Sequence, residues 1–322
     1  MTDIDQIQTW LVEALRHHEM GNVEGARDGY LKVLEVEPVH EKALILSGLL
    51  CLQCGEHDTA ETLLQIGVEN YPANPTFLNH LGASYLQRGD IEGAEAKIRA
   101  ALEINPNMVE ALFNLGLALR GLDRLQESSD TFDRIAELDP EHDMALVWRG
   151  IISREQGKLG TAIDKLLKAS EINPTNPEIF RNLGDTFMDL AEYTEAEQCY
   201  AQAVEFAPHV PAYKGRLASC LGQVGKHDEA LRLFDEALSE APDEAVLLGG
   251  KALVLAGKGD LEAGREVAEK AVALDKDSID GVFALARIFD ELGDKENADA
   301  AKARVRELAP NNARYLRGLD GD

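Results

Sequence analysis

Residues 75–108 carry the pattern that decides the fold, PTFLNHLGASYLQRGDIEGAEAKIRAALEINPNM. Within these 34 residues, apolar and small side chains recur at positions 4, 7, 8 and 11. They are Leu78, Leu81, Gly82 and Tyr85. This spacing is typical of one face of an α-helix. A second helical set stands at positions 20, 24 and 27, namely Ala94, Ile98 and Ala101. The segment therefore predicts two amphipathic helices.

A glycine and a proline mark where the two predicted helices end. Gly89 stands at position 15, and glycine ends helices well because it adopts the left-handed conformation without strain. Pro106 stands at position 32, where it lacks an amide donor and restricts the residue before it. The segment is therefore predicted to be a helix–turn–helix unit.

The same unit recurs along the chain without insertion. Prolines follow one another at intervals of 34 residues, at Pro38, Pro72, Pro106, Pro140, Pro174, Pro208 and Pro242; Lys276 and Pro310 continue the register. The repeats are residues 7–40, 41–74, 75–108, 109–142, 143–176, 177–210, 211–244, 245–278 and 279–312, with a short tail at 313–322. Position 8 is always glycine or alanine, which lets two helices approach closely. Because one helix pair cannot bury its apolar face alone, we expect a single stacked array over residues 1–322.

Composition and charge argue against several classes of binding partner and several cellular locations. The net charge is −26, with acid spread along the chain, which argues against nucleic acid and anionic lipid as partners. The N-terminus lacks the basic start and apolar run of a signal peptide, and no run of about 18 apolar residues predicts a membrane span. Cysteine is sparse, at four residues. These observations favour a cytoplasmic protein.

Motifs that carry chemistry are weak. Cys51 and Cys54 form a CxxC pair with no second pair nearby, so a packing role is favoured over zinc binding, as it is for Cys199 and Cys220. His17 and His18 are adjacent, which points their side chains to different sides of a helix. The continuous period leaves no room for a catalytic domain. We expect no enzyme activity, no metal and no cofactor.

The nine in-phase units resemble the tetratricopeptide repeat family, whose period is 34 residues. The resemblance implies an all-α, right-handed superhelical solenoid, in which first helices line a concave groove that binds peptides or helices of other proteins. Repeat 8 departs from the pattern because it is rich in glycine, with Gly249 and Gly250 in its first helix. Glycine weakens helices, so repeat 8 is predicted to be the loosest. The tail is too short for a full capping helix.

The resemblance also implies that positions 5, 9 and 12 of each first helix face inward. These positions are apolar through repeat 5, and arginines recur on successive first helices, which favours an acidic segment with apolar anchors as partner. Pairing of these arginines with local acids is the alternative. The predicted groove residues are Ile45, Leu49, Leu52, Asn79, Leu86, Phe113, Asn114, Leu117, Arg120, Val147, Trp148, Ile151, Arg154, Arg181, Asn182 and Arg216. Inward positions of repeats 7–9 are Gly215, Ser219, Gly222, Gly249, Leu253, Ala256, Phe283, Arg287 and Asp290.

Three functions remain open from the sequence. The first is an adaptor or scaffold that binds a peptide or helix of a partner protein in the groove of repeats 2–6. The second is the substrate-docking region of a larger bacterial enzyme, such as a glycosyltransferase or sulfotransferase. The third is a scaffold that forms homo-oligomers through uncapped ends.

Overall fold

The computed structural model describes residues 3–310 and 313–320, and the chain divides into two compact bodies. The N-terminal body comprises residues 1–152 and the C-terminal body comprises residues 153–322, with the boundary inside the helix Asp143–Glu155. The described residues form helices and turns and no strand, which confirms the all-α prediction.

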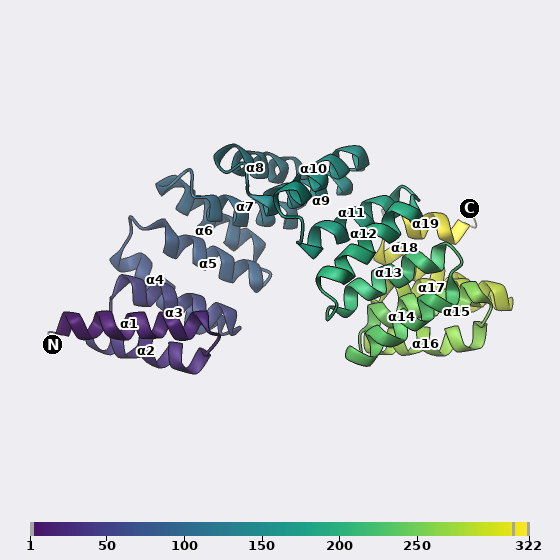
Figure 1. The fold of residues 1–322 in the computed structure, drawn as a ribbon, viewed down its shortest axis with the longest axis horizontal. Helices are drawn as coiled ribbons and strands as arrows, with labels where there is room; N and C mark the ends of the chain where they lie inside the picture. Colours follow the sequence, from purple (N-terminus) through teal and green to yellow (C-terminus); the bar gives the residue numbers. More distant parts are fainter. Residues whose placement is uncertain (1–2, 311–312, 321–322) are drawn as a thin grey trace. The chain divides into compact units, whose positions relative to one another are not determined.

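Each repeat contributes two helices at the places that the sequence predicts (Figure 1). The first helices are α1 Asp3–Glu19, α3 Glu41–Gln53, α5 Pro75–Gln87, α7 Val109–Gly121, α9 Asp143–Glu155, α11 Pro177–Asp189, α13 Pro211–Gln223, α15 Ala245–Lys258 and α17 Ile279–Leu292. The second helices are α2 Val23–Val36, α4 His57–Asn70, α6 Ile91–Ile104, α8 Leu125–Leu138, α10 Leu159–Ile172, α12 Tyr193–Phe206, α14 His227–Glu240, α16 Leu261–Leu274 and α18 Lys295–Leu308. A further helix, α19, spans Ala313–Asp320.

The two helices of a repeat meet where a small residue at position 8 faces a large residue at position 24. A Cβ added to Gly116 would lie 2.6 Å from the Phe132 ring, and one added to Gly184 would lie 2.6 Å from the Tyr200 ring. Phe132 and Tyr200 are themselves buried, at 0% and 2% exposure. The close approach predicted from the small residues is confirmed.

The turn between the two helices requires the left-handed backbone conformation at position 15. All seven glycines found there in the sequence have positive φ, from 71° to 92°. The other two repeats place Asp123 and Ala191 at this position, with φ of 58° and 60°. An L side chain is strained in this conformation, and alanine lacks the local hydrogen bonds that ease it for aspartate.

The glycines of repeat 8 pack closely against neighbouring helices, and the looseness of this repeat stays a prediction. A Cβ added to Gly249 would lie 2.7 Å from the backbone nitrogen of Gly281 on α17, and one added to Gly250 would lie 2.7 Å from the Phe234 ring on α14. These glycines let α15 pack directly against both α13 and α17. The glycine content therefore serves tight helix contacts, which offset its cost in helix propensity.

The short tail forms α19, which covers part of the last repeat. The Tyr315 hydroxyl donates to Asp280 Oδ1 at 2.8 Å, and the Tyr315 and Phe283 rings meet edge-on with centroids 5.3 Å apart. Tyr213 makes the matching bond in repeat 7, donating to Glu178 Oε1 at 2.5 Å. Tyr315 thus continues the register of the first helices. Helix α19 covers part of repeat 9, for which the sequence predicted no full capping helix.

Among the described residues, no helix is both long enough and apolar enough to cross a membrane.

Ala191→Gly is expected to raise the free energy of unfolding by about 1 kcal/mol, because it relieves left-handed strain and only part of that gain is lost to unfolded-chain entropy. The urea midpoint of the full chain measures this change. Gly225→Ala, at the same position of the next repeat, is the reciprocal control and should lower the midpoint. An unchanged or lower midpoint for Ala191→Gly contradicts the argument.

Gly249→Ala is expected to lower the free energy of unfolding by about 1–3 kcal/mol, because the added methyl group forces α15 and α17 apart. Gly160→Ala is the matched control, since a Cβ at Gly160 meets nothing within 4 Å. That control should stabilise the chain through helix propensity alone. Equal effects of the two substitutions on the urea midpoint would show that the α15–α17 contact is not tight.

Candidate functional site

The apolar residues of the predicted groove in the N-terminal body are largely packed between helices. Leu52 and Val147 are buried, at 7% and 1% exposure. Ile45, Leu86 and Leu117 are half-buried and pack against core clusters, and Leu49 and Ile151 are also half-buried. Neighbouring repeats therefore cover most of this stripe, so it offers a partner less apolar surface than the sequence pattern predicted.

An aromatic cluster lies among the predicted groove residues of the N-terminal body. The Phe113 and Trp148 rings both pack on Phe132, with centroids 5.5 Å and 6.3 Å away, and the Arg120 guanidinium lies 5.4 Å from the Trp148 centroid. Asn114 Nδ2 donates to Asn79 Oδ1 at 3.0 Å. These residues lie close together, but Asn79 is buried and the aromatic rings pack against the core.

Three of the predicted arginines converge on one carboxylate in the C-terminal body. Asp185, on α11, has a side chain that is 5% exposed. Arg181 Nη1 donates to its Oδ2 at 3.0 Å, and the Tyr200 hydroxyl donates to Oδ1 at 2.7 Å. Arg154 and Arg216 approach the same carboxylate at 3.4 Å and 3.6 Å. The arginines of repeats 5, 6 and 7 thus pair with acid inside the chain.

The pairing is reflected in the pKa values of these groups. The charge of Asp185 raises the pKa of Arg216. Burial opposes the charge on Arg181, but the hydrogen bond that it donates to Glu178 and the charge of Asp185 leave its pKa raised. Burial also raises the pKa of Tyr200. Arg181 and Arg216 therefore stay charged and Tyr200 stays protonated around the Asp185 carboxylate. Asn182, predicted for the groove, is buried beside it at 2% exposure and donates to the Glu178 carbonyl.

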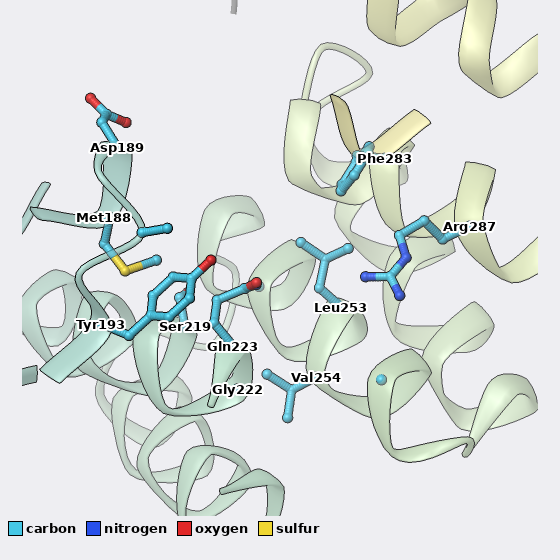
Figure 2. Close-up of a pocket in the computed structure, with 14 residues that line it drawn as sticks. Met188, Asp189, Tyr193, Ser219, Gly222, Gln223, Leu253, Val254, Phe283 and Arg287 are labelled. Carbon is cyan, nitrogen blue, oxygen red and sulfur yellow. The ribbon is translucent and has the colours of Figure 1, made fainter. Parts of the chain in front are cut away.

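A cavity of about 840 Å³ opens on the inner face of the C-terminal body (Figure 2). Its walls come from the first helices α11, α13, α15 and α17, with additions from α12 and α19. Leu253, Val254 and Phe283 give it apolar surface. Its size falls within the range of about 300–1,000 Å³ that is typical of binding pockets. This cavity is the candidate functional site.

Besides Asp189, four polar side chains line the cavity, namely Tyr193, Ser219, Gln223 and Arg287. Within the described part of the chain, none of the four has a hydrogen-bond or ion-pair partner for its side chain. Figure 2 shows the Tyr193 hydroxyl and the Arg287 guanidinium directed toward the cavity, while the Asp189 carboxylate points away. Because polar groups at an apolar surface gain from any partner that reaches them, the site is equipped to bind a polar ligand.

The sequence analysis assigned several residues of this cavity to inward positions, but it did not include them among the predicted groove residues. Ser219, Leu253 and Arg287 stand at position 9 of three successive repeats, where the family pattern places inner-face residues. The missed signal was the set of glycines on the first helices of repeats 7 and 8, of which Gly222, Gly250 and Gly257 line the cavity without side chains.

The cysteine and histidine motifs noted in the sequence form no metal site among the described residues. Burial raises the pKa of Cys51 to about 11, and its thiol is free. His18 lies within hydrogen-bond distance of the Tyr30 hydroxyl, at 3.0 Å, and of Gln53 Oε1, at 2.8 Å. Among the described residues, no group of three or more His, Cys, Asp or Glu side chains is placed to hold a metal ion.

Comparison with known families agrees with the repeat register. The profile described as "Tetratricopeptide repeat" matches residues 11–75, 79–141, 181–245 and 216–279. A second profile, described as "TPR repeat", matches residues 150–190.

One curated relative and two solved structures are similar over part or most of the chain. Human Protein O-mannosyl-transferase TMTC1 is 25% identical over 142 residues, which are 43% of this chain and 16% of that protein. The APC/C hetero-tetramer Cut9–Hcn1 gives a TM-score of 0.67 at 15% identity, covering 83% of this chain and 52% of that one. A tetratricopeptide repeat protein from Parabacteroides merdae gives 0.64 at 21% identity, covering 77% and 98%. At these identities the solved structures support the fold alone.

Asp185→Asn is expected to lower the free energy of unfolding by about 3 kcal/mol, because it leaves the half-buried Arg154 and Arg181 and the exposed Arg216 without their shared counter-charge. Asp235→Asn is the control, since Asp235 pairs with Lys251 but its side chain is 64% exposed. That control should change stability by less than about 1 kcal/mol. Urea unfolding measures both. A loss no larger than that of the control would show that the arginines do not depend on Asp185.

Proposed function

The chain belongs to the tetratricopeptide repeat family, and from this premise we propose that it is a binding scaffold that holds a segment of a partner protein in the cavity of its C-terminal body. Repeats of this family generally mediate protein–protein interactions. The proposal differs from the sequence prediction in place, because it moves the binding site from repeats 2–6 to repeats 6–9.

The cavity carries this proposal. An extended peptide presents backbone N–H and C=O groups along its length, and these need partners when they leave water. Tyr193, Ser219 and Gln223 can each both donate and accept a hydrogen bond, which suits a peptide backbone. Leu253 and Val254 offer apolar surface for a side chain of the same segment. The walls are helical, so the bound geometry needs little ordering.

A binding role is proposed in preference to catalysis. Apart from Asp189, whose carboxylate points away from the cavity, the polar side chains of the lining are an arginine, a tyrosine, a serine and a glutamine. A nucleophile needs an adjacent general base, and among the described cavity residues no histidine or carboxylate lies within hydrogen-bond distance of Ser219. Such a set can hold a ligand in place by hydrogen bonds and charge, but it offers no proton acceptor to activate the hydroxyl.

A second proposal is that the chain is the substrate-docking region of a larger glycosyltransferase. The similarity to human Protein O-mannosyl-transferase TMTC1 favours it, although this chain spans only 16% of that protein. The genomic reading frame beyond Asp322 tests the idea. A frame that continues into a transferase domain supports it, and a stop codon there contradicts it.

A photo-crosslinking residue at Gln223, on the cavity rim, is expected to capture a discrete partner in cells. The same residue at Ser239, exposed on α14, is the control and should capture nothing specific. Adding Leu253→Trp to the Gln223 probe places a bulkier side chain in the middle of the cavity wall and should weaken or remove the adduct. Mass spectrometry identifies the captured segment. Identical adducts at both positions, or an adduct that Leu253→Trp leaves undiminished, would exclude the cavity as the binding site.

A further inference from the structure

Arg287 is a half-buried arginine in a strongly acidic protein. The chain has 58 acidic residues and 32 Lys and Arg residues, so most cationic side chains find an acidic neighbour. Lys302 pairs with Asp290 one turn beyond Arg287 on α17, and Arg304 pairs with Asp277 and Glu307. Arg287 is half-buried, yet among the described side chains it has no ion-pair or hydrogen-bond partner.

The surroundings of Arg287 limit what it can bind. Leu253 lies beside it on α15, and Phe283 lies one turn before it on α17 (Figure 2). A guanidinium presents several donors in a fixed plane and matches a carboxylate in a bidentate manner. Apolar walls around it exclude water and strengthen that pairing. The ligand that fits is a carboxylate directly adjoining an apolar group.

The net charge of the chain further restricts the kinds of segment that can bind in the cavity. A net charge of −26 repels a polyacidic segment at long range, whatever Arg287 does at short range. A single carboxylate in a segment otherwise neutral or basic avoids most of that repulsion. The cavity of about 840 Å³ admits several residues, so one acidic side chain and its apolar neighbour fit together.

We propose that Arg287 selects a partner segment in which one Asp or Glu side chain follows an apolar residue, with neutral or basic residues on either side. The apolar residue packs on Leu253 and Phe283, and the carboxylate pairs with the guanidinium. This inference rests on the proposed function, since it assigns the chemistry of the segment that the cavity holds.

The probes are pools of ten-residue peptides, blocked by acetyl and amide groups and carrying a neutral dye. Outer positions are random mixtures of Ala, Ser and Lys, and the central pair is Leu-Glu, Leu-Gln or Leu-Lys. Fluorescence anisotropy with the full chain measures binding. The Leu-Glu pool is expected to bind about tenfold more tightly than the Leu-Gln pool, as one charge-assisted pairing contributes roughly that factor. The Leu-Lys pool should bind most weakly.

Arg287→Met keeps the apolar stem and should abolish the preference for Leu-Glu over Leu-Gln, whereas Arg287→Lys should retain part of it. Arg232→Met is the matched control, because Arg232 is 63% exposed on α14 and pairs with Glu236. That control should keep the full preference. Circular dichroism and the thermal midpoint verify that each variant is folded.

The failures of the two proposals are distinguishable. If the wild type binds Leu-Glu and Leu-Gln equally and Leu253→Trp blocks both, the cavity binds a segment but the role of Arg287 is wrong. Tight binding of a Leu-Gln pool with a free C-terminus would assign the carboxylate to a chain end and overturn the side-chain proposal. Binding that Leu253→Trp leaves intact, or no binding of any pool, overturns both proposals.

Discussion

The contact between a small residue at position 8 and a large residue at position 24 is the constraint on which the rest of the structure depends. Gly116 admits Phe132, and Gly184 admits Tyr200, so the two helices of a repeat lie close enough to bury their apolar faces. The same contact places the Tyr200 hydroxyl against Asp185. Repeat packing thereby positions the carboxylate that collects three arginines, and the charge network is a consequence of the helix spacing.

The cavity arises when small residues also occupy the inner face. Gly249 and Gly250 bring α15 within contact of α17 and of Phe234, so the first helices pack directly upon one another. Gly222 does the same for Val254 on the next repeat. Gly222, Gly250 and Gly257 line the cavity without side chains, so small residues also form part of its walls. Small residues at helix contacts thus contribute both to the packing of the repeats and to the walls of the candidate site.

The sequence predicted the features that follow from the 34-residue period. It did not predict contacts between side chains of different repeats. Helix bounds and the left-handed turn at position 15 follow from spacing and backbone sterics, and even Ala191 obeys them because the repeats on either side impose the turn. The sharing of Asp185 by Arg154 and Arg216 joins three repeats, and no spacing rule reveals it. The groove at repeats 2–6 remains a prediction, and the burial of Val147 shows why an apolar pattern alone does not establish an exposed surface.

A ligand in the cavity would act on the array as well as on its own site. Each repeat contacts only its neighbours, so the stability of the stack is roughly a sum of local interfaces. The cavity walls come from α11, α13, α15 and α17, which belong to four successive repeats. A segment that touches all four walls links interfaces that are otherwise independent, and it stabilises the folded state in proportion to its occupancy. Recognition in the cavity is thereby coupled to the integrity of repeats 6–9.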